Sequence, residues 1–493
     1  MHLDMLEELT NHSRGRRKGW AAPRGHAKST IVTMSKNIHK VCYKKISTSH
    51  FIGIVSEIEP MAIVRLKEIK AELEENMRLR AVYGDLVGNK TWLKKEVITS
   101  NGIMIKAYGA GSKMRGDRNK QWRLTDLAYD DVENRKSVKS AEQRAEQKDW
   151  FEKDTLKAGI PGYTNFEIVG TVLDDDSLLQ NLIKNPGWDI RVYRAVIDWP
   201  KDEAKLLWDQ WTEILVDLHR PNREDDADAF YARHKDRMLV GVKVLWPSRI
   251  PFVELMKMLV FEGRAAFETE LQNNPFNPET ALFQFDDAAR FRVDWERDLI
   301  IRRDGRFAKL SKTRRYSYHD PAYGETADGD FGCIVGGAVD EFGYLYVTNA
   351  YIKREPTSKQ IQAGFEQGAI WTPRAHGLET NSGWKLLGND YADEANRRAK
   401  MDPPEFSDLP LEQVFNTDNK QVRIAALEPK IANKWILFNE QLPEEFTAQM
   451  RKYPTHGYDD GPDALEGLVK VARRFEPNLF GGMDREREKR KAA

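Results

Sequence analysis

The stretch Ala22-Pro-Arg-Gly-His-Ala-Lys-Ser-Thr30 decides how the first half of the chain is interpreted. In the standard phosphate loop, two glycines bracket four residues before a lysine and a serine or threonine, so that backbone N–H groups, the lysine and a metal-bound hydroxyl converge on the phosphates. Here Lys28 and Ser29 are kept, but Ala27 and Ala22 stand at the two glycine positions. The stretch alone therefore fits both a phosphate loop and a plain turn before a helix.

The residues that follow the stretch predict a helix and then a buried strand. Apolar residues at helical spacing follow Thr30, which would place the loop at a helix N-terminus, where backbone amides bind anions. Phe51-Ile-Gly-Ile-Val-Ser56 is a continuous apolar run typical of a buried parallel strand, and residues 60–77 predict a helix after it.

Two further apolar runs each end in a polar cluster. One leads into Asp130-Asp-Val-Glu133, and Phe166-Glu-Ile-Val-Gly-Thr171 leads into Asp174-Asp-Asp176. The carboxyl ends of parallel strands meet along one edge of a sheet, where ligands bind. Mg²⁺ prefers oxygen ligands, and a carboxylate beside it can orient or deprotonate an attacking water. The three run ends together predict a nucleotide site on an α/β sheet.

Composition sets the limits of the interpretation. The 493 residues exceed the size of a single growing core, so two or three domains are expected. Lys and Arg equal Asp and Glu at 77 each, so any nucleic-acid contact must come from local basic patches. No apolar window is long enough to span a bilayer, no signal peptide is evident, and Cys42 and Cys333 form no disulfide framework. A cytosolic protein without membrane contact is expected.

The second half begins a new α/β pattern at Asp320-Pro-Ala-Tyr323. Two strands joined by the turn Asp340-Glu-Phe-Gly343 follow, then a helix over residues 358–371 and a strand that ends at Glu379. This order is that of an RNase H-like sheet. Two-metal cleavage of a phosphodiester requires carboxylates that hold two divalent ions about 3.5–4 Å apart. Candidates from three separate elements are Asp320, Glu379, Asp459, Asp460 and Asp463.

Three basic segments are candidates for phosphate or DNA contact. They are residues 14–18, the loop from Arg302 to Arg315, and Lys420 with Arg423. A solvated loop or an exposed helix face explains the first and the last as well. Residues 485–491, after Gly481 and Gly482, form a charged tail that we expect to be flexible.

Taken together, these motifs resemble the large terminases of tailed phages. The motor of that family carries a deviant phosphate loop, an acidic metal-binding motif and a Gly-Thr coupling motif in this order, as in residues 23–30, 130–133 and 169–171. The nuclease half is similar through residues 320–323, Asp330, residues 378–381, residues 420–427 and Tyr458-Asp-Asp-Gly-Pro-Asp-Ala-Leu465. The resemblance runs from Ala22 to about residue 471.

The resemblance implies roles for the motor residues. Lys28, Ser29 and Thr30 would bind the phosphates of ATP and Mg²⁺, and Asp130 would support the metal. The rest of the predicted nucleotide contacts are Arg24, Gly25, His26, Ala27 and Thr171, the last of which would couple hydrolysis to movement. Either Asp131 or Glu133 would handle the attacking water, because the usual Asp-Glu pair is Asp-Asp here. Arg24 and Arg115 are the arginines expected to stabilise the transferring phosphate, although each also fits a surface arginine.

The resemblance also implies the domain plan. Residues 1–198 would form a P-loop ATPase domain with a parallel sheet flanked by helices, and residues 199–301 a helical linker or lid. Residues 302–475 would form an RNase H-like, RuvC-like nuclease with two Mg²⁺ or Mn²⁺ ions on the acids named above, and residues 476–493 the tail. The tryptophans of the linker are expected in core or interdomain packing.

The expected function is a viral DNA-packaging motor of the host cytoplasm that drives double-stranded DNA into a procapsid and cuts concatemers. The resemblance implies a portal protein, a small terminase subunit and a ring of five copies as partners. Two alternatives stay open: a nuclease-helicase of repair or recombination, and a portal-bound structural subunit with decayed sites. Ala27 and the Asp130-Asp131 pair motivate the last of these.

Overall fold

The computed structural model describes residues 1–8, 11–134, 137–138, 140–275, 281–322, 330–379, 384–416 and 419–482. The chain divides into two compact units. Unit 1 comprises Met1–Trp199, Gly241–Lys257 and Ala265–Asn277, and unit 2 comprises Pro200–Val240, Met258–Arg264 and Pro278–Ala493. The predicted linker, residues 199–301, is therefore shared between the two units. The predicted positions Tyr323 and Asn381 and the charged tail 485–491 lie outside the described residues.

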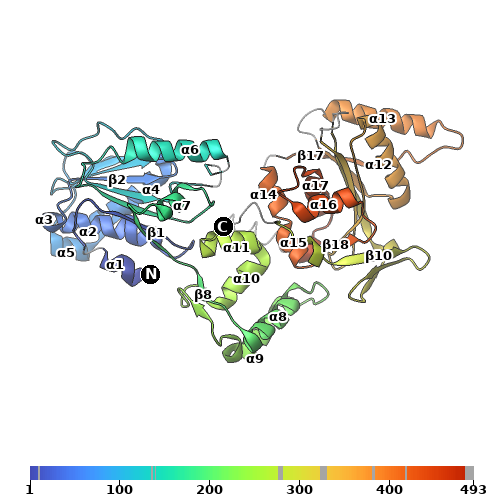
Figure 1. Ribbon diagram of the computed structural model, residues 1–493, viewed down its shortest axis with the longest axis horizontal. Helices are drawn as coiled ribbons and strands as arrows, with labels where there is room; N and C mark the ends of the chain where they lie inside the picture. The colour runs from blue at the N-terminus through green and yellow to red at the C-terminus, as the bar shows by residue number, and fades with distance from the viewer. Residues whose placement is uncertain are drawn as a thin grey trace. The chain divides into compact units, whose positions relative to one another are not determined.

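Unit 1 is built on a seven-stranded sheet with the strand order β3-β4-β2-β5-β6-β1-β7 (Figure 1). All neighbouring strands are parallel except β3 and β4. The strands are β1 (Arg17–Ala21), β2 (Phe51–Ser56), β3 (Glu96–Ile98), β4 (Met104–Gly109), β5 (Asp126–Asp130), β6 (Asn165–Gly170) and β7 (Asp189–Val192). Two short strands, β8 (Val196–Asp198) and β9 (Lys243–Val244), pair separately.

Helices cover both faces of this sheet. The helical segments are α1 (His2–Glu7), η1 (Thr30–Ser35), α2 (Lys36–Cys42), α3 (Lys44–Ser47), α4 (Glu59–Glu75), α5 (Met77–Tyr83), α6 (Ala141–Trp150), η2 (Phe151–Thr155) and α7 (Leu178–Lys184). In β2, Ile52 and Ile54 face α2 and α4, whereas Phe51 and Val55 face α6, η2 and α7. The predicted strand 51–56 is therefore buried on both faces, which explains why its apolar run does not alternate.

The division between the units runs through two consecutive helices. They are α10 (Phe252–Glu262) and α11 (Arg264–Gln272). Most of α11 belongs to unit 1, where the N–H of Ala195 donates to the carbonyl of Leu271 over 2.8 Å. Over the described ranges, no helix has the length and apolar composition to cross a membrane.

Unit 2 contains a nine-stranded sheet with the order β12-β11-β10-β18-β15-β14-β13-β16-β17. The strands are β10 (Arg290–Asp294), β11 (Leu299–Arg302), β12 (Phe307–Lys309), β13 (Arg314–Asp320), β14 (Gly332–Val339), β15 (Leu345–Lys353), β16 (Ala375–Glu379), β17 (Leu411–Val414) and β18 (Ile436–Asn439). Within β15-β14-β13-β16-β17, only β14 is antiparallel to its neighbours. This is the strand arrangement of the RNase H fold, and the predicted fold class is confirmed.

The helical segments of unit 2 follow in chain order. They are α8 (Asp202–Val216), α9 (Arg223–Met238), η3 (Phe285–Asp287), η4 (Leu310–Lys312), α12 (Thr357–Trp371), α13 (Trp384–Ala399), α14 (Lys420–Ala425), α15 (Glu428–Ala432), α16 (Glu444–Lys452), α17 (Asp460–Phe475) and η5 (Leu479–Gly482). Figure 1 shows α12 and α13 on one face and α14, α16 and α17 on the other. Gly467 lets α17 approach β13, because a Cβ there would lie 2.2 Å from the ring of Tyr318.

The tryptophans of α8 pack in a core, as the sequence predicts. Trp208 and Trp211 are buried, and their rings meet edge to face at 5.1 Å. The indole N–H of Trp208 donates to the carbonyl of Met238 at the end of α9 over 2.8 Å. These contacts join α8 and α9 into one helical pair.

Candidate active sites

Residues 22–30 form the turn between β1 and the helical segment η1. β1 ends at Ala21, and the N–H of Ala22 donates to the carbonyl of Gly170 over 3.0 Å. Gly25 and Ala27 take positive φ values of 76° and 58°, and η1 continues the chain into α2. A positive φ is costly for alanine and free for glycine. Ala27 thus adopts a left-handed backbone conformation that favours glycine, at a cost in strain.

Lys28 is buried and faces the end of β6. Its Nζ donates to Oγ1 of Thr171 over 3.1 Å and lies 3.5 Å from Oδ1 of Asp131. The three residues come from the ends of β1, β6 and β5, which are neighbours in the sheet. The predicted convergence of these strand ends at one edge is observed.

Ser29 and Asp130 form the second contact of the site. The hydroxyl of Ser29 donates to Oδ1 of Asp130 over 2.5 Å. The other oxygen of Asp130 accepts from Nε of Arg65, on α4, over 2.7 Å. A hydroxyl beside a carboxylate is a donor set that suits Mg²⁺, so these residues fit the predicted metal. Arg65 was not predicted, because nothing in its sequence context distinguishes it from other charged residues of an amphipathic helix.

Asp131 and Glu133 lie in different surroundings. Asp131 has a φ of 46°, and its side chain is 51% exposed beside Lys28. Desolvation raises the pKa of Asp131, and Lys28 opposes the rise. The carboxylate of Glu133 accepts from the N–H groups of Leu178 (2.6 Å) and Leu179 (3.0 Å), at the start of α7. Burial raises the pKa of Glu133, and these backbone bonds oppose the rise.

The other residues predicted to surround the nucleotide differ in their burial and in their partners. Arg24 is 78% exposed and lies 3.8 Å from Glu270. Arg115 pairs with Asp154 over 3.4 Å, and Thr30 is exposed at the start of η1. His26 is buried; its Nδ1 lies 3.0 Å from the carbonyl of Arg24, and burial lowers its pKa. Both arginines therefore pair with a carboxylate near the surface.

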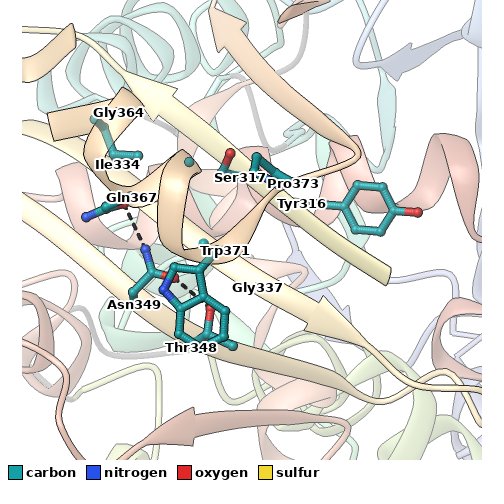
Figure 2. A pocket seen from close by; sticks show the side chains of 12 residues that line it. Tyr316, Ser317, Ile334, Gly337, Thr348, Asn349, Gly364, Gln367, Trp371 and Pro373 are labelled. Atoms are coloured by element: carbon teal, nitrogen blue, oxygen red, sulfur yellow. Dashed lines mark hydrogen bonds between the residues drawn. The ribbon is translucent and has the colours of Figure 1, made fainter. Parts of the chain in front are cut away.

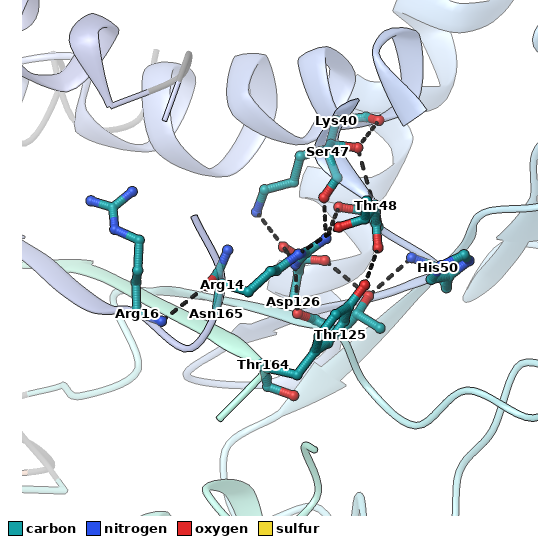
Figure 3. Close-up of polar contacts among 12 residues, drawn as sticks. Arg14, Arg16, Lys40, Ser47, Thr48, His50, Thr125, Asp126, Thr164 and Asn165 are labelled. Carbon is teal, nitrogen blue, oxygen red and sulfur yellow. Dashed lines mark hydrogen bonds and ion pairs between the residues drawn. The ribbon is translucent and has the colours of Figure 1, made fainter. Parts of the chain in front are cut away.

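The basic run 14–18 is engaged inside unit 1. Arg14 pairs with Asp126 over 3.0 Å, as Figure 3 shows, and Asp126 also lies 3.2 Å from Nζ of Lys40. Arg16 pairs with Glu8, and Lys18, in β1, pairs with Asp189. These three side chains are therefore paired with carboxylates of unit 1 rather than free in a solvated loop, and the predicted contact with phosphate or DNA stays a prediction.

The acids of unit 2 meet at the end of two neighbouring strands. Asp320 ends β13 and Glu379 ends β16, and these strands are parallel, so both carboxylates lie at one edge. Asp460 and Asp463 lie in the first turn of α17, which packs against β13 and β16. The three elements predicted from the sequence therefore converge.

The charges of this cluster act on one another. Desolvation raises the pKa of Asp320 well above its usual range, and Asp463 and Glu379 add to the rise. Burial raises the pKa of Asp460 to about 6, while a hydrogen bond from the N–H of Phe331 opposes it. Close carboxylates with raised pKa values lose repulsion when a divalent cation binds. The donor set fits the predicted divalent ions.

Two basic side chains occupy the same cluster. Nζ of Lys420 lies 2.7 Å from Asp459 and 3.2 Å from Asp463, and Nη2 of Arg423 lies 2.9 Å from Asp463. Within the described residues, no three acidic, histidine or cysteine side chains are arranged to hold a metal as they stand. Lys420 and Arg423 were predicted only as DNA contacts or as an exposed face. Here they compensate the acids.

The basic loop 302–315 is also largely paired. Arg302 lies 2.7 Å from Asp304, Arg303 lies 2.6 Å from Glu440, and Arg306 lies 2.8 Å from Asp217. Arg314 pairs with Glu476 over 2.5 Å, and Arg315 donates to the carbonyl of Trp371 over 3.1 Å. These arginines are therefore paired within unit 2, and contact of this loop with the DNA backbone stays a prediction.

A small hollow lies between α12 and the strands β13, β14 and β15 (Figure 2). Its polar lining includes Asn349, whose amide donates to Oε1 of Gln367 over 2.8 Å. None of the predicted acids lines it, so this hollow is separate from the carboxylate cluster.

The fold and the two sites define a class: a phosphate-loop domain and an RNase H-like domain in one chain. Neither a protein-family model nor a curated protein matches the sequence. The chain is similar to the large terminase of a thermophilic bacteriophage, solved in complex with ADP, at 9% identity and a TM-score of 0.42 over 95% of this chain and 98% of that one. The large terminase of bacteriophage HK97 matches at 12% identity and a TM-score of 0.31, over 95% and 94%.

A third similarity is confined to a smaller part of the chain. The terminase nuclease domain of human cytomegalovirus, solved with Mn, matches at 10% identity and a TM-score of 0.25, over 33% of this chain and 85% of that one. These similar solved structures are thus terminases, the family that the sequence motifs resemble.

Proposed function

We propose that the chain is a phage large terminase, which uses ATP hydrolysis to drive double-stranded DNA into a procapsid and cuts the concatemer at the start and end of packaging. One observation supports this most strongly. A single chain carries a phosphate-loop site around Lys28 and Asp130 and a carboxylate cluster around Asp320 and Asp463, each on its own sheet. Movement and cutting of one polymer require both.

In unit 1 the proposed reaction transfers the γ-phosphoryl group of ATP to water. Lys28 would bind the β- and γ-phosphates, and Ser29 and Asp130 would hold Mg²⁺, which supplies charge neutralisation on the phosphate oxygens. Asp131 would orient the water and accept its proton, since its exposed carboxylate lies 3.5 Å from Nζ of Lys28. Glu133 stays bound to the start of α7. Arg24 and Arg115 are the candidates for the transition-state arginine.

The contact between Lys28 and Thr171 supports a coupling role for Thr171. When Lys28 turns to a phosphate, Thr171 loses its 3.1 Å bond. The next residue, Val172, donates its N–H to Oδ1 of Asn273 over 3.0 Å, and Asn273 donates to the carbonyl of Tyr193 over 2.8 Å. A displacement of Thr171 would therefore be transmitted through the buried side-chain amide of Asn273 to the segment after α11.

In unit 2 the proposed reaction is hydrolysis of a DNA phosphodiester. Asp320, Glu379, Asp460 and Asp463, with Asp459 at the rim, would hold two Mg²⁺ or Mn²⁺ ions, which activate water and stabilise the leaving oxygen. Cations on these acids would take over the charge compensation that Lys420 and Arg423 now give Asp463, so both basic side chains would be available to the DNA backbone, with Arg423 still paired to Glu466.

The proposed partners follow from the terminase assignment: double-stranded DNA, the portal of the procapsid, the small terminase subunit and a ring of five copies, in the host cytoplasm. The geometry speaks against decayed sites. Ala27 has a positive φ that suits glycine, and Asp131 lies 3.5 Å from Nζ of Lys28. Both departures from the usual motif are therefore compatible with activity.

An ATPase assay tests this proposal against the alternatives. Portal-bearing procapsids should stimulate hydrolysis more than free DNA does, and Lys28→Ala should abolish it. Lys45→Ala, at an exposed lysine of α3, is the matched control and should behave like the wild type. Stimulation by DNA alone would favour a nuclease-helicase, and no hydrolysis above background would favour a structural subunit.

A further inference from the structure

A single buried side chain brackets the backbone around Asp320. Gln360, on α12, is fully buried. Its Oε1 lies 3.0 Å from Nε2 of His319, before Asp320, and accepts from the N–H of Ala322, after Asp320, over 3.4 Å. Its Nε2 donates to the carbonyls of Ala322 (2.9 Å) and Glu355 (2.7 Å). The amide therefore binds the chain on both sides of the carboxylate that ends β13.

The Gln360 amide lies at one end of a longer chain of buried hydrogen bonds. Oη of Tyr391, on α13, lies 3.0 Å from Nδ1 of His319 and 3.0 Å from Nε2 of His376. Nδ1 of His376 lies 2.7 Å from Oγ of Ser317.

With Oε1 of Gln360 as the acceptor at one end, the donors along this chain follow one order. Ser317 donates to His376, His376 to Tyr391, Tyr391 to His319, and His319 to Oε1 of Gln360. Each ring and the tyrosine hydroxyl then make one donation and one acceptance, and the chain ends at Gln360. The carbonyls of Ala322 and Glu355 fix which way the Gln360 amide faces, because only Nε2 can donate to them.

The sheet leaves space for this amide at one position. A Cβ on Gly332, the first residue of β14, would lie 2.2 Å from Cδ and 2.2 Å from Oε1 of Gln360. Gly332 thus lets the Gln360 amide reach the end of β13. Any side chain there would displace the amide.

We propose that Gln360 is a positioning residue of the nuclease site, which fixes the backbone on both sides of Asp320 so that its carboxylate faces Glu379 and Asp463. This inference rests on the proposed nuclease function. Groups that orient a metal ligand through hydrogen bonds typically change metal affinity about 10- to 100-fold when they are lost. Methionine has nearly the volume of glutamine but cannot form the four bonds.

The experiment measures Mn²⁺ binding to the full chain by electron paramagnetic resonance, without nucleotide. Binding that Asp320→Asn removes defines the nuclease ions. Gln360→Met should weaken that binding about tenfold and raise the Mn²⁺ concentration for half-maximal plasmid cleavage in proportion, with near-normal cleavage at saturating Mn²⁺. Gln367→Met is the matched control, since Gln367 lies on the same helix and bonds only Asn349 among the described residues. It should leave Mn²⁺ binding unchanged.

A second variant changes Gly332, the residue of β14 that lies against the Gln360 amide. Gly332→Ala should lower Mn²⁺ affinity in the wild-type background, because it displaces the Gln360 amide. In the Gln360→Ala background the added methyl has room, so Gly332→Ala should have little further effect. This non-additivity distinguishes loss of the Gln360 hydrogen bonds from general damage to the fold.

The outcomes separate the two claims. Wild-type protein that binds no Mn²⁺ through Asp320 would overturn the nuclease function and this inference together. Wild-type binding with equal affinity in Gln360→Met, or with additive effects of Gly332→Ala and Gln360→Ala, would overturn the inference alone.

Discussion

The hydroxyl of Ser29 lies 2.5 Å from Oδ1 of Asp130, although the two residues are 101 positions apart in the sequence. The bond joins the start of the first helix after β1 to the carboxyl end of β5, with β6 between the two strands. Arg65 holds the other oxygen of Asp130. The hydroxyl and the carboxylate that we propose as Mg²⁺ ligands therefore already lie side by side.

Loss of this hydroxyl should impair hydrolysis more than folding. Ser29→Ala removes a proposed Mg²⁺ ligand, and we expect the ATPase rate to fall about 100-fold, as for loss of one group that stabilises charge in a transition state. Steady-state phosphate release measures this. Ser35→Ala, which removes a hydroxyl that bonds the carbonyl of Thr30, is the control and should retain most activity. Comparable loss in both variants would argue against a metal-binding role for Ser29.

Asp131 and Glu133 should separate by phenotype. Asp131→Asn removes the proposed base, so it should reduce the ATPase rate at least about 100-fold with little change in the melting temperature. Glu133→Gln keeps an acceptor for the N–H groups at the start of α7 and removes a carboxylate whose pKa burial raises, so it should keep most activity and lose little stability. Thermal unfolding and ATPase assays on both variants check this. The reverse pattern would assign the water to Glu133.

Substitution of Ala27 by glycine should not impair the protein, unlike the substitutions described above. Because Ala27 has a φ of 58°, Ala27→Gly should relieve about 1 kcal/mol of strain, partly offset by the greater freedom of glycine in the unfolded chain. We expect equal or higher stability and a retained ATPase. A large loss of activity in Ala27→Gly would show that the methyl group itself has a role at the site.

The pKa of Asp460 predicts a dependence of stability on pH. Burial raises this pKa from 3.8 to about 6, so its unfavourable effect is absent below pH 3.8 and grows as pH rises through 6. Asp460→Asn should therefore stabilise the metal-free protein at pH 7 by about 2–3 kcal/mol and change little at pH 4. Calorimetry at both pH values measures this. An equal gain at both would contradict the assignment.

Added Mn²⁺ should reverse that order at pH 7. The ion stabilises the folded wild type by mass action and gains less in Asp460→Asn, which lacks one carboxylate. Mn²⁺ that stabilises both proteins equally would exclude Asp460 from the metal site.

The sequence predicted the parts of the sites that local patterns encode. Apolar runs located β2, β5 and β6, and the rule that parallel strands end at one edge brought Lys28, Asp130 and Thr171 together. What it missed depends on pairing across the fold. Arg65 contacts Asp130 from a helix 65 residues away, and Gln360 reaches the chain beside Asp320 through contacts that no spacing records.

The ion pairs of the basic segments also could not be predicted from the sequence. Arg14 and Arg306 looked like free cations in the sequence, yet each meets a distant carboxylate, Asp126 or Asp217. Charge runs indicate where cations are, but only the fold shows which of them are already neutralised.

The central claim is that one chain holds a motor and an independent nuclease, and a packaging assay with portal-bearing procapsids and linear DNA tests it most directly. Lys28→Ala should leave no DNA protected from added nuclease while metal-dependent plasmid cleavage persists. Asp320→Asn should protect DNA like the wild type while cleavage is lost. Protection that survives Lys28→Ala, or cleavage that survives Asp320→Asn, would contradict the account.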